Sequence, residues 1–411
     1  MTNHFDKMET RSHDEREGDL FTRLPNHLKT AVGVSPSLSK HLNEQDLGVV
    51  NCREALAKLP VLRKPELMAA QTKNPPFGGF VNLKALAGSR VFLSPGPIWE
   101  PQGAGADPWL GARALYAAGF RKGHMVHNAL SYHMTPGGFI LDEGLRELGC
   151  TVFPAGIGNT EMQVEAAVAL QPVAYTGTPD YLKVILDKAE ELGKDLSCIK
   201  RALVSGGALF PSMREEYTKR GVAVLQAYAT ADLGVIAYES SFKGGPTEGM
   251  IVNEDLIVEI VRPGTDDPVE DGEVGELVVT NFSMTYPLVR FGTGDLSAVL
   301  PGQSACGRTN MRIKGWMGRA DQRTKVKGMF IDPKQIADLV KRHGEIEGAR
   351  LIVARDGDQD VMRLLVKGMG IDTGAVSTSL RELTKLGGAV EVVKELPNDG
   401  KVISDERDYD A

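Results

Sequence analysis

The chain has 411 residues, more than one compact core usually holds, so we expect two or more domains. Its net charge of −7 argues against nucleic acid as the main partner, because phosphate backbones select basic surfaces. No apolar run is long enough to span a membrane, and the polar residues 1–20 contain no stretch typical of a secretory signal. We therefore expect a cytoplasmic globular protein.

Residues 1–20 predict a frayed, charged leader, and residues 21–83 favour solvent-facing helices. After them, short apolar runs that end in Gly, Ser or Ala alternate with stretches of helical length. The expected strands are 90–94, 150–156, 201–207 and 222–229, and the expected helices include 161–170 and 180–192. This order predicts a parallel sheet with crossover helices, in which ligands bind at the carboxyl ends of the strands.

The pattern changes further along the chain. β-Rich runs at 256–263 and 275–282, separated by a turn-forming segment, predict a small antiparallel sheet. Residues 321–411 read as a separate α+β module. The expected fold is therefore α/β. A large N-terminal domain over 21–320 combines mixed, largely parallel sheets with a small antiparallel subdomain, and a small C-terminal domain follows.

The cysteines Cys52, Cys150, Cys198 and Cys306 are widely spaced and form no CxxC pair. This spacing is typical of reduced thiols and not of a disulfide framework or a complete zinc site.

Several motifs resemble, in order and spacing, the adenylate-forming superfamily of acyl-CoA synthetases and, within it, the phenylacetate–CoA ligases. They are LPVLRKPEL, the segment 127–165, GELVVTNFSMTYPLVRFGTGDLSAV and GRADQRTKVKGMFIDPKQI, and the resemblance covers nearly the whole chain after the leader. It implies an enzyme that activates a carboxylic acid with ATP as acyl-AMP and passes the acyl group to the thiol of coenzyme A. It also implies that the C-terminal domain is mobile and rotates about a hinge at Asp321.

Two motifs and a shorter segment define the expected nucleotide site. FGTGD places Asp295 in a Gly-containing turn, where a carboxylate can accept both ribose hydroxyls. Taken alone, it would more often be a turn Asp that bonds its own backbone, and the surrounding match is what favours the ribose role. AYATAD contains Tyr228, whose family counterpart packs on adenine, and Asp232, whose counterpart holds the Mg²⁺ of ATP. Gly207 and Ala208 match the family's adenine-side Gly-Ala-Glu-Pro, which here loses its Glu.

Two basic residues match the family's catalytic groups. Arg319, in GRADQ, stands where the family's Arg contacts the nucleotide, and a guanidinium suits phosphate and ribose oxygens. Lys401, in ELPNDGKV, matches the C-terminal Lys whose ammonium reaches the α-phosphate and the carboxylate of the acid. Considered alone, both would be ordinary surface charges, and the surrounding match is what favours catalytic roles.

The phosphate-binding loop departs from the family pattern. The family's Ser-Ser-Gly-Thr-Thr-Gly-x-Pro is replaced by SPGPIWEPQG at 94–103. Proline has no N–H to donate to a phosphate, and Glu100 adds negative charge. We expect Ser94 and the N–H of Gly96 to recover part of the missing contacts. We also expect the β and γ phosphates of ATP to be held weakly.

The acid is expected to bind at Tyr132, His133, Gly137 and Gly138, where relatives hold it. The glycine pair would let a planar ring approach the backbone, whereas the two side chains could line the pocket or pack the sheet. An aromatic acid is what the resemblance implies.

Some family members bind a structural zinc through Cys and His. Here Ser240 and Ser304 replace two of the expected ligands and Cys306 remains, so we expect no zinc, because one thiolate cannot make a four-ligand site. The expected small-molecule partners are a carboxylic acid, ATP with Mg²⁺, and CoA. A homodimer is compatible with this reading, and neither nucleic acid nor a membrane is expected as a partner. Two alternatives stay open: an acyltransferase that loads a carrier or amine, and a non-catalytic acid- or nucleotide-binding paralogue.

Overall fold

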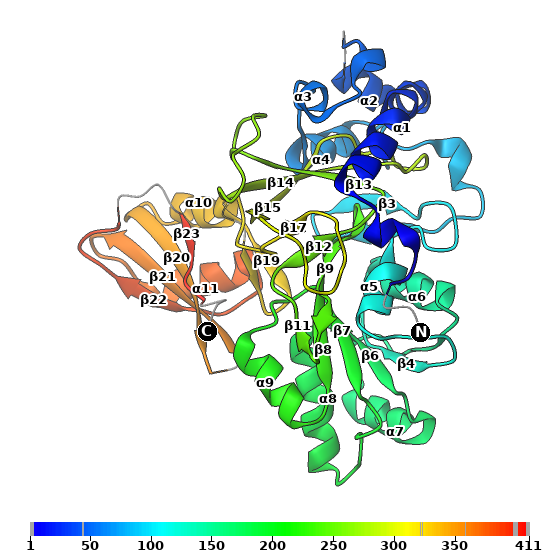
Figure 1. Cartoon of the computed structure of the whole chain (residues 1–411). Helices are drawn as coiled ribbons and strands as arrows, with labels where there is room; N and C mark the ends of the chain where they lie inside the picture. The colour runs from blue at the N-terminus through cyan, green and yellow to red at the C-terminus, as the bar shows by residue number, and fades with distance from the viewer. Residues whose placement is uncertain are drawn as a thin grey trace. The chain divides into compact units, whose positions relative to one another are not determined.

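The computed structural model describes residues 4–42, 45–320, 322, 324–357, 359–397 and 402–407 (Figure 1). The chain divides into two compact units, Met1–Trp316 and Met317–Ala411, each with its own hydrophobic core. Mixed sheets accompanied by helices confirm the predicted α/β fold class. The functional boundary predicted after residue 320 stays a prediction, because its hinge residue, Asp321, lies outside the described residues.

A nine-stranded sheet in the order β16-β17-β12-β9-β8-β7-β6-β4-β5 forms the centre of the larger unit. Its strands β5, β4, β6, β7 and β8 run parallel, as the strand–helix rhythm predicts, and the others are added antiparallel. The parallel strands and the helices between them are β4 Met125–Asn128, α6 Gly137–Glu147, β5 Thr151–Pro154, α7 Thr160–Leu170, β6 Ala174–Gly177, α8 Pro179–Glu191, β7 Arg201–Val204, α9 Pro211–Lys219 and β8 Ala223–Thr230. The antiparallel strands are β9 Gly234–Tyr238, β12 Met250–Val252, β16 Val299–Leu300 and β17 Arg312–Ile313. Pro179 and Pro211 begin their helices at the position where a missing N–H costs nothing.

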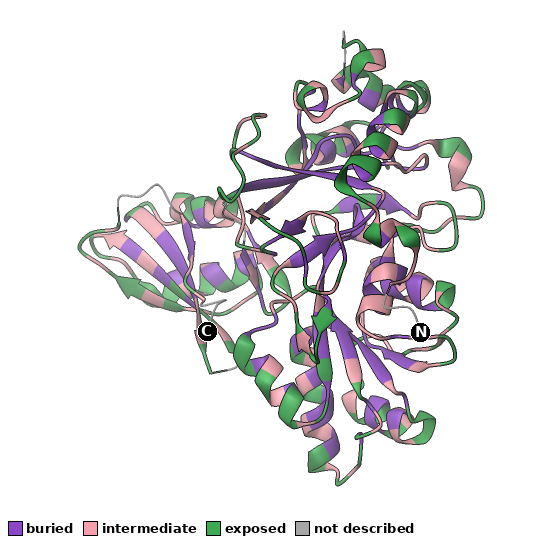
Figure 2. Cartoon of the chain, in the orientation of Figure 1, coloured by how far each residue is buried: buried purple, intermediate pink, exposed green. Residues whose placement is uncertain are grey.

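A four-stranded sheet in the order β1-β15-β14-β13 contains the antiparallel part that the sequence predicts, in β13, β14 and β15, and β1 is added parallel to β15. Its strands are β1 Leu62–Arg63, β13 Leu256–Val261, β14 Gly275–Asn281 and β15 Phe291–Ser297. Every residue of β13 and β14 is buried, and Figure 2 shows both strands in the colour of buried residues.

Arg290 ties this sheet to the segment before β1. The side chain is fully buried, and its Nε donates to Glu259 at 3.0 Å. Its remaining nitrogens donate to the carbonyl oxygens of Ala57, Leu59 and Asp266. A guanidinium satisfied in this way can remain buried without the cost of an unpaired charge.

The predicted strand at 90–94 does not belong to the parallel sheet. β2 Val91–Ser94 pairs instead with β3 Ile98–Pro101 in a two-stranded antiparallel hairpin. The hairpin is fixed to α4 Lys64–Lys73 by Gln71, whose side-chain amide donates to the carbonyl of Trp99 and accepts from its N–H, both at 2.8 Å. The segment expected to be a phosphate loop is therefore a hairpin held against a helix.

The charged leader predicted over residues 1–20 is also different, since it is structured from Lys7 onwards. It forms η1 Lys7–Thr10 and the start of α1 His13–Val34, where Ser12 and Glu15 form a capping box. We call residues 4–19 the N-terminal strap. Charged side chains favour exposure to solvent only where no oppositely charged group is available. Those of the strap form ion pairs with residues far along the chain.

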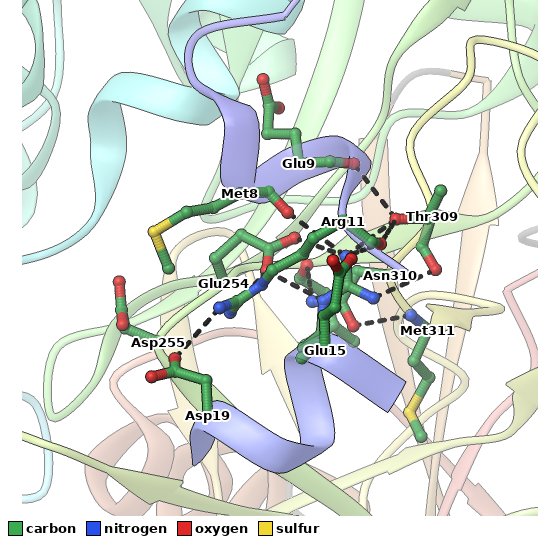
Figure 3. Close-up of polar contacts among 12 residues, drawn as sticks. Met8, Glu9, Arg11, Glu15, Asp19, Glu254, Asp255, Thr309, Asn310 and Met311 are labelled. Carbon is green, nitrogen blue, oxygen red and sulfur yellow. Dashed lines mark hydrogen bonds and ion pairs between the residues drawn. The ribbon is translucent and has the colours of Figure 1, made fainter. Parts of the chain in front are cut away.

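Figure 3 shows part of the polar network that holds the N-terminal strap. Arg11 pairs with Asp19 at 3.0 Å and with Glu254 at 3.2 Å, and its carbonyl accepts from the hydroxyl of Thr309. Glu9 is 1% exposed and accepts from Nε of Arg308 at 2.5 Å.

The smaller unit contains a four-stranded sheet in the order β22-β21-β20-β23 and two helices that pack on each other. Its elements are β18 Thr324–Val326, β19 Met329–Ile331, α10 Pro333–Arg342, β20 Ile346–Asp356, β21 Gln359–Gly368, α11 Thr373–Thr384, β22 Ala389–Val392 and β23 Ile403–Asp405. The short elements left in the larger unit are α2 Pro36–His41, η2 Leu47–Val49, α3 Arg53–Leu56, η3 Leu83–Leu86, α5 Gly111–Ala117, β10 Ser241–Phe242 and β11 Gly245–Pro246. Across the described residues, no helix combines the length and the apolar character that crossing a membrane requires.

Candidate active site

Asp295 lies within strand β15 and not in the turn that the sequence predicts. The pairing with β14 shifts register here, since Val278 pairs with Gly292 but Glu276 pairs with Leu296. The extra residues form a bulge, in which Gly294 adopts a positive φ of 74°. A bulge re-aims the side chains beside it, and it gives Asp295 an orientation that a regular strand would not.

Two aromatic side chains converge on the carboxylate of Asp295. The hydroxyl of Tyr228, on β8, donates to Oδ2 at 2.7 Å, and Nε1 of Trp316 donates to Oδ1 at 3.2 Å. The structure thus brings together the predicted Tyr and Asp from two different sheets. Each carboxylate oxygen can accept more than one hydrogen bond, so the pair can still receive ribose hydroxyls. The contribution of Trp316 was not predicted.

Gly207 and Ala208 lie just after β7, beside β8. The two strands run parallel as far as Val204 and Gln226, and the side chain of Gln226 donates to the carbonyl of Gly207 at 3.0 Å. Gly207 and Ala208 therefore lie at the carboxyl end of a parallel strand, which is the edge at which such sheets bind ligands. Tyr228 follows at the same end of the neighbouring strand.

Asp232 belongs to a buried cluster with Lys64 and Glu100. Its side chain is 1% exposed, and Nζ of Lys64 lies 2.9 Å from its Oδ2. Glu100, on β3, is also 1% exposed, and its carboxyl group contacts that of Asp232. Burial and then the charge of Asp232 raise the pKa of Glu100 well above its usual range, although Lys64 acts in the opposite direction. The sequence identified Glu100 only as an unfavourable charge near phosphate.

The β2–β3 hairpin explains this position of Glu100. Ser94, Ile98 and Glu100 are buried along the hairpin, whereas Trp99 between them is exposed. The hydroxyl of Ser94 donates to the carbonyl of Ile98 at 3.5 Å, and Gly96 lies in the turn. The predicted contacts of Ser94 and Gly96 with phosphate stay predictions.

The cluster has the chemistry that Mg²⁺ requires, since this ion prefers carboxylate and other hard oxygen ligands. Within the described chain neither oxygen of Glu100 has a well-formed hydrogen bond, although Ser94 lies beside it, and the buried hydroxyl of Tyr286 also lacks a hydrogen-bond partner. Burial, followed by the charges of Asp232 and Glu100, raises the pKa of Tyr286. The described residues contain no group of three or more His, Cys, Asp or Glu side chains that could hold a metal. A Mg²⁺ ion bound by this cluster would therefore need phosphate or water oxygens as its remaining ligands.

The predicted acid-binding residues lie at the start of α6. The ring of Tyr132 packs so closely on Gly138 that a Cβ there would lie 2.7 Å from it. The hydroxyl of Tyr132 donates to Asp142 at 2.7 Å, while His133 is exposed and Gly137 begins the helix. The glycine does admit a planar ring, and in this structure the ring is that of Tyr132.

The predicted catalytic residues belong to the smaller unit. Arg319 is half-buried, and its carbonyl accepts from the N–H of Gln322 at 3.4 Å. Lys401 lies outside the described residues. Its neighbour Val402 donates its N–H to Oε1 of Gln322 at 2.7 Å, so the two segments that carry these residues meet within this unit.

The three positions assigned to the lost zinc site also come together. The hydroxyls of Ser240 and Ser304 each lie 3.1 Å from Sγ of Cys306, and Nη1 of Arg308 lies 3.6 Å from it. Burial would raise the pKa of this thiol, but these hydrogen bonds outweigh burial and lower it. The expectation that the protein binds no zinc stays a prediction.

Comparisons with known proteins fit this geometry. Residues 112–286 match the AMP-binding enzyme family. The crystal structure of 2-hydroxyisobutyryl-CoA ligase in complex with 2-HIB-AMP and CoA has a TM-score of 0.81, covers 99% of this chain and 93% of that chain, and shares 21% identity, which shows the fold alone. The family match, together with the curated relatives described next, shows that the chain is an adenylate-forming enzyme.

Curated relatives show which family of adenylate-forming enzymes the chain belongs to. The phenylacetate–coenzyme A ligase of Pseudomonas putida is 31% identical over 382 residues, 88% of this chain and 84% of the relative. That of Escherichia coli (strain K12) is 30% identical over 381 residues, with the same coverage of 88% and 84%. The chain belongs to the phenylacetate–coenzyme A ligase family of AMP-forming acid–thiol ligases, and the predicted resemblance is confirmed.

Proposed function

We propose that the chain activates an aromatic carboxylic acid with Mg-ATP as acyl-AMP and transfers the acyl group to coenzyme A. The observation that carries this proposal is the convergence of Tyr228 and Trp316 on Asp295, a carboxylate oriented for the two hydroxyls of a ribose. The aromatic substrate is supported by the relatives' names as phenylacetate ligases.

In the first step a carboxylate oxygen of the acid attacks the α-phosphorus of ATP, and pyrophosphate leaves. Asp295 accepts the ribose hydroxyls, while Gly207 and Ala208 line the adenine side. Arg319 and Lys401 neutralise the charge that develops between phosphate and acid. Asp232 would hold Mg²⁺, which would screen the phosphate oxygens when bound. In the second step the thiol sulfur of CoA attacks the acyl carbon and AMP leaves.

A panel of acids tests the function directly. Aromatic acids such as phenylacetate and benzoate, with 2-hydroxyisobutyrate and acetate as aliphatic controls, are incubated with Mg-ATP, with and without CoA. We expect CoA-dependent release of AMP and a thioester with at least one aromatic acid. Turnover confined to the aliphatic acids would contradict the aromatic assignment. AMP and adenylate formation that CoA never accelerates would instead favour the loading of a carrier or an amine.

The hairpin at β2–β3 supports a second candidate. Because it replaces an open loop of N–H donors, the chain could bind AMP or acyl-adenylate without forming it from ATP. Exchange of labelled pyrophosphate into ATP distinguishes the two functions. Exchange with any acid excludes the second candidate, and AMP binding without exchange for the whole panel excludes the first.

A further inference from the structure

The buried cluster around Glu100 contains several oxygen atoms that the single ion pair of Lys64 with Asp232 does not satisfy. Lys64 lies on one oxygen of Asp232, at 2.9 Å, whereas neither oxygen of Glu100 has a well-formed hydrogen bond in the described chain, although Ser94 and Asp232 lie beside it. The hydroxyl of Tyr286 is buried without a hydrogen-bond partner in the same part of the structure. Leaving a buried carboxylate without a hydrogen-bond partner is unfavourable, so the cluster favours a further, positively charged occupant.

We propose that Glu100 and Asp232 together bind one Mg²⁺ ion through the protein itself, before any nucleotide arrives. The proposal rests on the proposed function, because it gives the metal of that reaction a second protein ligand. A bound metal requires both carboxylates to be ionised, and with the ammonium of Lys64 they then carry a net charge of −1 in a buried site, whereas without a metal Glu100 holds a proton more readily. A divalent cation changes this net charge from −1 to +1, which favours a phosphate oxygen as a further ligand, and Mg²⁺ usually binds through one or two carboxylates while keeping waters or phosphates as its other ligands.

The backbone around Glu100 is fixed, as a metal ligand requires. Gln71 holds both backbone polar groups of Trp99 at 2.8 Å, and pairing with Phe92 on β2 holds Glu100 from the other side. Its carboxyl group is therefore positioned by secondary structure and not by a flexible loop.

This site also accounts for the altered segment 94–103. The segment gives up backbone N–H donors for phosphate and places an acidic side chain beside Asp232 instead. A cation held by that pair binds phosphate oxygens directly, so it can replace the missing donors. The competing explanation is a closed structural triad in which Lys64 and a proton neutralise the two carboxyl groups and no metal binds.

Metal titration of the full chain separates these explanations. Protein stripped with EDTA is titrated with Mg²⁺ by calorimetry and with Mn²⁺ by electron paramagnetic resonance, without nucleotide, acid or CoA. We expect one ion per chain. Glu100→Gln and Asp232→Asn should each weaken binding at least tenfold, and Glu100→Asp, which keeps a carboxylate, should weaken it less. Glu248→Gln, at an exposed carboxylate, serves as the matched control and should bind like the wild type.

Thermal melting of each variant shows that it is folded, and Mg²⁺ should raise the melting temperature of the wild type but not of Glu100→Gln. The absence of saturable binding to the wild type overturns the proposal, as does undiminished binding to Glu100→Gln. These measurements involve no turnover. A negative result therefore leaves acid activation to be judged by AMP release, and a failed acid panel leaves the metal site standing.

Discussion

At the scale of single residues, the candidate site depends on a carboxylate that is oriented before any ligand arrives. Asp295 receives hydrogen bonds on both oxygens, and the bulge at Gly294 sets its direction. Hydrogen bonds to a charged group are worth about 1.5–3 kcal/mol each, so removing one should be measurable in nucleotide binding.

Tyr228→Phe should weaken AMP binding about tenfold or more, because it removes one charge-assisted hydrogen bond to Asp295 and keeps the aromatic ring. Calorimetric titration with AMP measures the change. Tyr116→Phe is the control, since Tyr116 stacks beneath Arg121 and belongs to neither the nucleotide residues nor the acidic cluster. Equal AMP affinity in the wild type and Tyr228→Phe would show that this hydroxyl does not organise the site.

The sequence predicted part of this site, and the remainder has a common physical explanation. Tyr228 and Asp295 lie in motifs whose residues suggest their chemistry directly. The contributions of Lys64, Glu100 and Trp316 arise from contacts between segments far apart in the chain, such as the ion pair of Lys64 with Asp232. No local pattern encodes such contacts, so they became visible only with the fold.

At the scale of elements, helix α1 buries a histidine against the antiparallel sheet. The ring of His27 lies 5.1 Å from that of Phe282, and its Nε2 is buried without a hydrogen-bond partner in the described structure. Burial, and then the charge of Arg23, lowers the pKa of His27 to about 4. Protonation of His27 is therefore far easier in the unfolded chain than in the folded one.

Stability should accordingly fall as the pH drops from about 6.5 towards 4, because the unfolded chain binds the proton first. The pKa difference corresponds to a loss of up to about 3 kcal/mol in the free energy of unfolding. Denaturant unfolding at pH 7 and pH 4.5 measures it. His27→Gln should lose this part of the pH dependence, whereas His133→Gln, at an exposed histidine, should keep it. An unchanged dependence in His27→Gln would assign the effect to other groups.

The helices and strands were predicted correctly where a segment's own residues determine its structure. The predictions failed where contacts with distant segments determine it. The helices expected at 161–170 and 180–192 correspond to α7 Thr160–Leu170 and α8 Pro179–Glu191. The run at 90–94 looked like a strand of the parallel sheet, but its pairing with β3 excludes it from that sheet. The leader looked frayed because its charges were counted without Arg308 and Glu254, which neutralise them.

At the scale of the whole molecule, the proposed chemistry is divided between two units. The residues proposed to orient the nucleoside belong to the larger unit, and Arg319 and Lys401 belong to the smaller one. If adenylation uses both and nucleoside binding uses mainly the first, the two properties should be separable by mutation.

Lys401→Ala should lower adenylate formation by at least a hundredfold, because its ammonium is the proposed partner of the charge that develops in that step. Thioester formation from pre-made acyl-adenylate and CoA should fall far less. Rapid-quench assays of each half-reaction measure both rates, and Lys385→Ala in the same unit is the control. Equal losses in both half-reactions would contradict the role assigned to Lys401.

The N-terminal strap has a consequence for how the chain is made on the ribosome. Glu9 and Arg308 are separated by 299 positions, so at about 5–20 residues per second Glu9 waits roughly 15 to 60 s for its partner to be translated. Until then the pair of Arg11 with Asp19 can form within the strap, but Glu9 lacks Arg308. A product whose synthesis stops before Arg308 would expose the N-terminal strap to proteases, so cleavage within residues 4–19 would distinguish incomplete from complete copies of the larger unit.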